Sequence, residues 1–460
     1  QVQSKLFGAT TSCIEYVHPW TTSCSKATAE LLIHSAQDCL RIYSAVYSLS
    51  LLMRGRLPTL TDLQRTLLGI LQSSAFLTTS AFTYPMLLCM IRHIFGSFNF
   101  YTVSYIPAFI AAFIAILVER PSRRPLLTLY VSNVATETLW RMLVARKLVK
   151  SIPCGESLIF AVSTSVLLYY FRLDSRAKQK DSIFDVIRFV VGNTEMLNQN
   201  PNPSQSDRNI HSQSNRHTDN GFRKYRLIQF VIKIYRQLID LLKQFHKKHQ
   251  LCKHENSCLF YTVKGGAKLF SIGFGIQLTI KLFLQAKKLA KKPSNFLKIF
   301  SSKDIFKLGM FLGGFSALFK GSSCVLRHMT NLDLPFYAIP SGLIASIAFG
   351  YYPDNSIALY IMWKALQISY NRNVEAGYLP KVPYFTIFLY CASTALLFHA
   401  ATLEPLNLRP SYWKFLHSLS GARIALMDRK FMDIWGLETS DAVRKVSQLT
   451  NTDFEIKFRI

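Results

Sequence analysis

The stretch "TLLGILQSSAFLTTSAFTYPMLLCMI", residues 66–91, contains no charged side chain. A helix needs roughly 20 apolar residues to cross the ~30 Å hydrocarbon core of a bilayer, and this stretch is long enough. Buried helices of soluble proteins are usually shorter and keep a polar edge. Further uncharged runs lie at 94–118, 334–353 and 382–403. The sequence therefore predicts an all-α, polytopic membrane protein whose first partner is the lipid bilayer.

The composition agrees with a membrane protein. Half of the 460 residues are hydrophobic, and the formal net charge is +28. The basic residues are separated from the long uncharged runs, as in membrane proteins with cationic loops. A nucleic-acid-binding protein would interleave its basic residues with polar ones, so we expect no nucleic-acid partner.

The sequence also repeats itself. "CMIRHI" at 89–94 returns as "CVLRHM" at 324–329, with Cys, Arg and His in the same order. Other identical residues recur at separations of 230 to 235 residues, as short deletions after a duplication would produce. They are Cys24 and Cys258, Ile106-Pro107 and Ile339-Pro340, Leu129-Tyr130 and Leu359-Tyr360, and Ser163-Thr164 and Ser393-Thr394. We infer that the two halves arose from one duplicated unit.

Each half is predicted to contain four spanning helices, so the fold is two tandem four-helix repeats. An extra helix, which either spans the membrane or lies on its surface, precedes each set, at 28–53 and 259–284. With four spans most arginine-rich loops fall on one side of the membrane, with Arg146, Lys147 and Lys150 as the exception. An even number of spans makes the repeats parallel. The predicted spans are 67–91, 103–118, 126–146 and 156–171, then 307–327, 335–352, 356–374 and 383–403.

The two halves are separated by a polar region. Residues 193–221 are rich in Asn, Ser, Gln and Pro and cannot bury a core, which predicts disorder. Residues 223–249 place apolar side chains three and four apart among Lys and Arg, which predicts a basic amphipathic helix. This helix packs on the protein's own cytosolic face, adsorbs to an anionic lipid surface or docks with a partner helix. The predicted regions are 1–171 (first membrane repeat with a cysteine-bearing N-terminal part), 172–250 (disordered linker and basic helix), 251–405 (second membrane repeat) and 406–460 (polar C-terminal tail).

One charged pair lies inside a predicted span. Glu137 and Arg141 are four residues apart, so they share one helix face and can pair with each other. Ionisable groups at membrane depth are costly and usually face a bundle interior or a wet cavity. We expect a structural ion pair, with a polar transport pathway as the alternative. The corresponding positions of the second half are Gln367 and Asn371, so such a pathway would be asymmetric.

Small residues recur at fourfold spacing in the second half. Such residues let helix backbones approach closely in lipid, where packing replaces the hydrophobic effect. The predicted helix-packing positions are Gly309, Gly313, Gly342, Ser346 and Gly350.

A catalytic interpretation rests on His328 and Asp333. Their H-x₄-D spacing occurs in membrane acyltransferases, where the histidine takes a hydroxyl proton and the aspartate orients its ring. The spacing arises easily by chance, and the matching His93 has no aspartate five residues on. We therefore expect no catalytic residues and no enzymatic activity.

Two groups of cysteine and histidine residues precede corresponding helices. Thiolates and imidazoles are zinc ligands. The spacings differ between the groups, and neither contains the tight pair of a zinc ribbon, so we expect reduced cysteines at the membrane edge, with no metal and no cofactor. Zinc binding is the alternative, which metal analysis tests. The groups are Cys13, His18 and Cys24, and Cys252, His254 and Cys258.

Several long motifs resemble the transmembrane protein 135 family. They are "NVATETLWRMLVAR" (133–146), "CKHENSC" (252–258), "KGSSCVLRHMTNLD" (320–333) and "LRPSYWKFL" (408–416). The resemblance covers nearly the whole chain. Residues 321–346 are more loosely similar to the peroxisomal membrane protein 4 and mitochondrial preprotein translocase superfamily, which favours four helices per repeat.

The resemblance implies a multi-pass protein of peroxisomal and mitochondrial membranes. It is linked to mitochondrial fission and organisation and to peroxisomal lipid metabolism, with protein partners of organelle dynamics and no catalytic residues to carry over. One alternative is a direct lipid or metabolite carrier or pore at the inter-repeat interface. A remote alternative is an acyltransferase that uses His328 and Asp333.

Overall fold

The computed structural model is helical throughout the part of the chain that it describes. That part comprises residues 8–52, 58–174, 181–197, 249–254, 257–291 and 302–456. A single bridge between Ala9 and Phe98 is the one extended pairing in these ranges. The all-α prediction is confirmed. Most of the predicted linker, and residues 223–248 of the predicted basic helix, lie outside the described residues.

Five helices among the described residues are long and apolar enough to cross a membrane. They are α3 (Leu60–Phe95), α6 (Gly155–Leu173), α9 (Cys258–Lys291), α11 (Asp304–Thr330) and α14 (Phe385–Leu403). In α9 the long apolar part comprises residues 258–285. The prediction of a multi-span helical membrane protein is confirmed at this level. Predicted spans 67–91, 156–171, 307–327 and 383–403 coincide with four of these helices.

The other four predicted spans fall on helices that are too short or too polar to cross a membrane. Helix α4 (Tyr105–Val118) is apolar but has only 14 residues. Helices α5 (Arg124–Ala145) and α13 (Asn355–Glu375) carry too many polar and charged side chains. The stretch predicted at 335–352 is divided into short pieces, because α12 (Ala338–Ala345) is followed by a 3₁₀ turn from Ser346 to Tyr351.

The chain forms two compact units. Unit 1 consists of residues 1–151 and 380–460, and unit 2 of residues 152–379. The fourth predicted span of each half therefore belongs to the unit that contains the other half's first three. Unit 1 contains α1 (Cys13–Tyr16), α2 (Cys24–Leu52), α3, α4, α5, α14, α15 (Pro410–Leu419), α16 (Arg423–Leu426) and α17 (Thr439–Thr450), and unit 2 contains α6, α7 (Ser182–Val191), α9, α11, α12 and α13.

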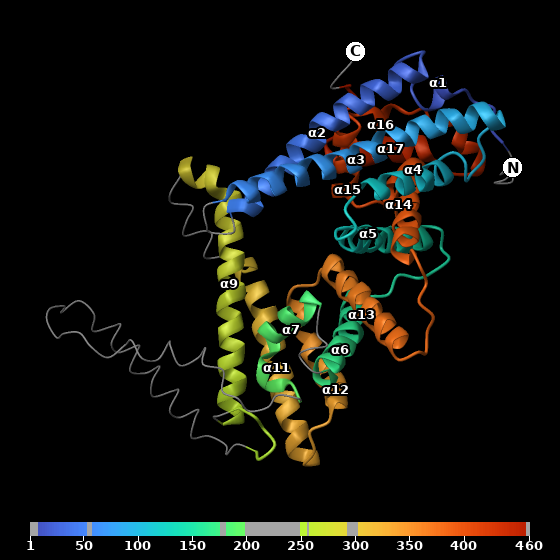
Figure 1. Cartoon of the computed structure of the whole chain (residues 1–460). Helices are drawn as coiled ribbons and strands as arrows, with labels where there is room; N and C mark the ends of the chain where they lie inside the picture. The colour runs from blue at the N-terminus through green and yellow to red at the C-terminus, as the bar shows by residue number, and fades with distance from the viewer. Residues whose placement is uncertain are drawn as a thin grey trace. The chain divides into compact units, whose positions relative to one another are not determined.

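Helices pair in the same pattern in both units. In unit 1, α3 packs on α2 and α4, and α14 packs on α4 and α5. In unit 2, α11 packs on α9 and α12, and α6 packs on α12 and α13 (Figure 1). Each unit therefore has a long antiparallel hairpin, α2–α3 or α9–α11, with shorter helices on one side of it.

Two regions are more ordered than predicted. Helix α7 lies in the predicted linker, and it buries Ile183, Phe184, Ile187 and Val191 because they recur at helical spacing. Residues 406–456 are not a simple polar tail, since their helices pack into the core of unit 1 with Trp413 fully buried. Helix α7 is itself largely apolar, whereas the polar average composition of residues 406–456 conceals the apolar faces of their helices.

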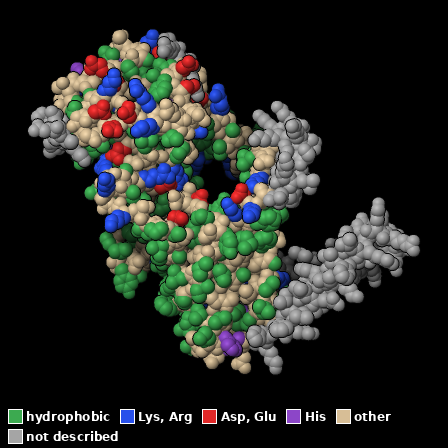
Figure 2. Space-filling view, turned by 180° about the vertical axis from the view of Figure 1, so that it is seen from behind, with side chains coloured by type: hydrophobic (Ala, Val, Ile, Leu, Met, Phe, Trp, Pro, Cys, Tyr) green, Lys and Arg blue, Asp and Glu red, His purple; other side chains and the backbone are tan. Residues whose placement is uncertain are grey.

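Hydrophobic side chains gather on the surface of unit 2, as Figure 2 shows. Only 11% of the most apolar 18-residue stretch of α9 is buried inside the protein. Lipid-facing helices keep such a surface, because the bilayer itself solvates apolar side chains. Strongly exposed examples are Val325, Met329, Phe336, Leu343 and Ile347.

Glycines set the close approach of α9 and α11. A methyl group on Gly313 would lie 2.7 Å from the backbone oxygen of Gly266, and one on Gly309 would lie 2.9 Å from that of Phe270. Gly342 similarly brings α12 against Ser165 of α6.

The other two predicted packing positions differ from each other. Ser346 is buried, and its hydroxyl donates a 2.7 Å hydrogen bond to the Gly342 carbonyl. A methyl group on Gly350 would meet no described neighbour within 4 Å, so this glycine is not at a helix contact.

We expect Gly313→Ala to destabilise unit 2 by about 1–3 kcal/mol, because overpacking forces two backbones apart. The matched control is Gly275→Ala on α9, where an added methyl meets nothing within 4 Å. Thermal unfolding of the detergent-purified variants measures the difference. Equal melting temperatures would show that the helix approach does not depend on Gly313.

Candidate functional site

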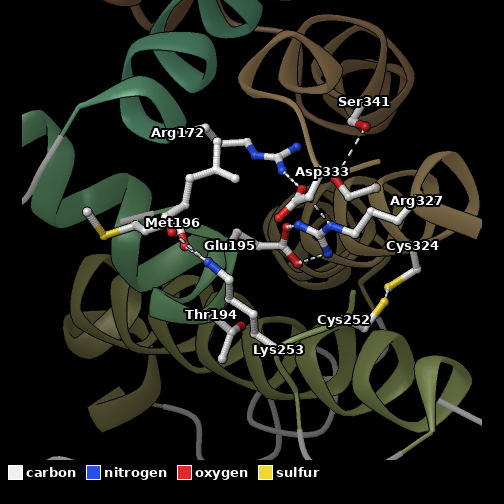
Figure 3. Close-up of polar contacts among 12 residues, drawn as sticks. Arg172, Thr194, Glu195, Met196, Cys252, Lys253, Cys324, Arg327, Asp333 and Ser341 are labelled. Atoms are coloured by element: carbon white, nitrogen blue, oxygen red, sulfur yellow. Dashed lines mark hydrogen bonds and ion pairs between the residues drawn. The ribbon is translucent and has the colours of Figure 1, made fainter. Parts of the chain in front are cut away.

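Four charged side chains form a buried cluster in unit 2, which we call the unit 2 charge cluster (Figure 3). Arg327 Nη2 lies 2.5 Å from Glu195 Oε2, and Arg327 Nε lies 3.0 Å from Asp333 Oδ1. Asp333 also accepts a hydrogen bond from Arg172, whose side chain is fully buried. Two guanidinium groups thus neutralise two carboxylates, of which Glu195 is buried and Asp333 is half-buried.

The unit 2 charge cluster joins segments that are far apart in the sequence. Arg172 ends α6, Arg327 lies in the last turns of α11, and Asp333 follows that helix. Glu195 comes from the region predicted to be disordered, so sequence reasoning missed it. A single acidic residue in an Asn-rich stretch carries no periodic signal that would have revealed its burial.

Lys253 binds the short segment that follows Glu195. Lys253 Nζ donates to the backbone oxygens of Met196 and Leu197 at 2.9 and 2.7 Å. Burial lowers the pKa of Lys253, although the nearby Asp333 carboxylate opposes this effect. The chain just after Glu195 is therefore held by charge-assisted hydrogen bonds.

The proposed acyltransferase pair is not in contact. The ring of His328 is exposed and packs edge-on against His249, with 5.3 Å between ring centroids. Asp333 is bound by two arginines instead. The structure therefore places the aspartate in the unit 2 charge cluster and not behind the histidine.

Glu137 and Arg141 lie in contact on α5, as predicted from their spacing. Arg141 Nη2 is 2.5 Å from Glu137 Oε1. Arg409, which sequence reasoning did not connect with this pair, binds the second carboxylate oxygen and lies 3.4 Å from Asn133 Oδ1. The motifs at 133–146 and 408–416 thus meet in unit 1, and one buried carboxylate serves two guanidinium groups.

A cysteine–histidine cluster lies at the open end of the α2–α3 hairpin. We call it the unit 1 cysteine cluster, and it consists of the predicted group Cys13, His18 and Cys24 together with Cys89 of α3. Cys13 Sγ and Cys24 Sγ are 3.4 Å apart, and His18 Nε2 is 3.2 Å from Cys24 Sγ. Burial raises the pKa of Cys13.

A second such cluster lies at the open end of the α9–α11 hairpin. This unit 2 cysteine cluster consists of Cys252, His254, Cys258 and Cys324. Cys252 Sγ is 3.9 Å from Cys324 Sγ and 3.8 Å from Cys258 Sγ, and His254 Nε2 is 3.6 Å from Cys324 Sγ. The hydrogen bond that Cys252 shares with Cys324 lowers the pKa of Cys252.

Each predicted group is thus completed within its own unit by a cysteine from a long helix. Those two cysteines, Cys89 and Cys324, are the ones that open the repeated "CMIRHI" and "CVLRHM" motifs. In both clusters the four candidate ligand atoms lie within 4.8 Å of one another. The arrangement favours the zinc alternative over the expectation of isolated reduced thiols.

Residues 10–144 match the family model for the N-terminal cysteine-rich region of Transmembrane protein 135. The resemblance to this family is confirmed over those residues, which include the whole unit 1 cysteine cluster and the Glu137–Arg141 pair. No solved structure matches the chain.

We expect Glu195→Gln to destabilise unit 2 by about 3–5 kcal/mol, because removing one partner leaves a buried charge uncompensated. The control is Asp185→Asn on α7, an exposed carboxylate whose ion pair with Arg188 contributes little. Denaturant unfolding followed by tryptophan fluorescence gives both values. A small, equal effect in the two variants would mean that the unit 2 charge cluster is not stabilising.

Proposed function

We propose, from the match of residues 10–144 to the transmembrane protein 135 family model, that this protein regulates organelle membranes without catalysing a reaction. Its site of action is the peroxisomal and mitochondrial membranes, where it acts on mitochondrial dynamics and peroxisomal lipid metabolism. The family match carries this proposal. The five candidate spanning helices support residence in a membrane.

A regulatory role agrees with the placement of the charged residues. Asp333 and Glu195 are each bound by arginine, and such satisfied buried pairs are typical of structural elements. The non-enzymatic part of the proposal is supported by the partners of Asp333, because Arg172 and Arg327 bind the carboxylate that an acyltransferase would use to orient His328.

We expect a fluorescently tagged full-length protein to colocalise with peroxisomal and mitochondrial membranes. Cells that lack the protein should show altered mitochondrial network length and altered peroxisomal lipids, and the wild-type chain should restore both. Imaging and lipid profiling of the same cells measure these effects. Residence at another membrane, together with an unchanged network and unchanged lipids in the deficient cells, would contradict the proposal.

We also propose that the two halves of the sequence derive from one ancestral repeat. Backbone conformations recur in the same register, with positive φ at three matched positions 230 or 235 residues apart. These pairs are Gly96 and Asn331, Lys147 and Gly377, and Cys154 and Tyr384. The first pair ends α3 and α11, where the cap N–H donates to the carbonyl of Arg92 or Arg327. A left-handed residue is uncommon outside glycine, so its recurrence at equivalent places supports duplication.

A second candidate function is a carrier for an anionic lipid or metabolite. Glu137 is bound by both Arg141 and Arg409, so this group carries one excess positive charge. The Arg141 side chain is 40% exposed and so remains accessible to a solute. A cationic group beside apolar helices suits an anionic headgroup or carboxylate.

For the carrier, we expect Arg141→Gln to fold but to lose flux in reconstituted liposomes, because it removes the exposed guanidinium group and with it the excess positive charge. Folding is preserved because Glu137 keeps its ion pair with Arg409. The matched control is Lys307→Gln, which removes an exposed cation that pairs with Asp304 on α11. Flux of an anionic fluorescent lipid equal to that of the wild type would rule out this pathway.

A further inference from the structure

We propose that each cysteine cluster binds one Zn²⁺ ion, so that the protein contains two structural zinc centres. The unit 1 and unit 2 cysteine clusters each offer three thiols and one imidazole. Structural zinc sites are four-coordinate, and Cys₃His is one of their usual ligand sets. This inference is independent of the proposed role at organelle membranes.

The spacing of the ligand atoms fits one tetrahedral ion. Bonds of ~2.3 Å to sulfur and ~2.0–2.1 Å to nitrogen place two sulfurs about 3.8 Å apart and a sulfur and a nitrogen about 3.5 Å apart. In unit 2, Cys252 lies 3.8 Å from Cys258 and 3.9 Å from Cys324, and the sulfur-to-nitrogen distance between Cys324 and His254 is 3.6 Å. In unit 1 the corresponding distances of 3.4 and 3.2 Å need only a small outward adjustment.

The histidine of unit 1 is oriented for metal binding. His18 Nδ1 lies 2.9 Å from the backbone oxygen of Thr21, and a carbonyl oxygen can only accept. Nδ1 must therefore carry the proton, which leaves the lone pair of Nε2 directed at Cys24. A hydrogen bond of this kind at the second ring nitrogen is the common support of zinc-bound histidine.

An arginine supports each cluster from one turn further along the helix. Arg92 follows Cys89 by three residues and donates to the backbone oxygens of Thr11 and Thr10 at 2.6 and 3.0 Å, just before Cys13. Arg327 stands in the same relation to Cys324 and anchors the unit 2 charge cluster. The repeated Cys-x-x-Arg thus supplies one metal ligand and one clamp on a neighbouring segment.

Each zinc would close a helical hairpin at its open end. Cys24 begins α2 and Cys89 lies near the end of α3, while Cys258 begins α9 and Cys324 lies near the end of α11. Binding of Zn²⁺ displaces the three thiol protons of each cluster to solvent and forms four coordinate bonds. The ion would therefore cross-link the two helices and the short segment that precedes the hairpin.

The same geometry separates zinc from two other uses of cysteine. A disulfide joins two sulfurs at about 2.05 Å and would leave the third thiol and the histidine without a role. An iron–sulfur cluster holds its ligands around more than one iron atom, and so it spreads them more widely than a single ion does. Four mutually close ligand atoms favour the single ion.

The first experiment measures metal content. The full-length protein is purified in detergent with a histidine-free tag, stripped with a chelator under reducing conditions and refilled with Zn²⁺ alone or Mg²⁺ alone. We expect two zinc ions and no magnesium per chain by elemental mass spectrometry, and a higher melting temperature with zinc. Reduced, folded protein that retains less than one zinc per chain would overturn the proposal, as would iron or intact disulfides in the protein as isolated.

The second experiment assigns each ion to its cluster. Cys24→Ser and Cys258→Ser should each retain one zinc, the double variant should retain none, and Cys154→Ser should retain two, because Cys154 is exposed and lies in neither cluster. If a serine variant fails to fold, Cys89→His and Cys324→His preserve four ligands and should still bind two ions. Two zinc ions in the double serine variant would show that the metal binds elsewhere and would refute both centres.

Discussion

Every polar group that folds among these apolar helices must find its partner within the protein, because lipid offers none. Arg327 finds Glu195 across 132 residues, and Glu137 finds Arg409 across 272 residues. A helix can pair charges four residues apart, as Glu137 and Arg141 do, but Arg327 and the second oxygen of Glu137 depend on residues of other segments. The long helices and the loops between them are therefore mutually dependent, and the ion pairs select which segments pack together.

The sequence was informative where a single local property decides the structure. Uncharged runs identified α3 and α14, since a membrane span needs only length and apolarity. The other two runs, at 94–118 and 334–353, fall on α4 and α12, which are too short to span. It was uninformative where tertiary packing decides. Nothing in the polar composition of residues 406–460 shows that Trp413 is buried, and nothing local distinguishes Glu195 from the acidic residues that remain at the surface. Burial of such residues depends on partners that composition does not contain.

The cysteine clusters show a similar limit. The groups before each hairpin were visible as pairs of cysteines with a histidine, but their spacing resembles no zinc ribbon. The missing member of each group lies about 65 residues further on, near the far end of a long helix, and only antiparallel folding of the hairpin returns it. The repeated Cys-x-x-Arg marked that residue without indicating its use. Zinc motifs with short spacings do not detect a ligand that is separated from the others by the length of two helices.

The order of the units along the chain has a consequence for biosynthesis. Unit 2 is continuous, whereas the two parts of unit 1 flank it in the sequence, so that α14 to α17 are made after unit 2. Domains generally fold as they leave the ribosome, with the earliest complete one first. Unit 2, which lies between the two parts of unit 1 in the sequence, is the unit whose residues are all synthesised first. The helices of residues 1–151 must therefore wait, incompletely covered, until residues 380–460 have been translated.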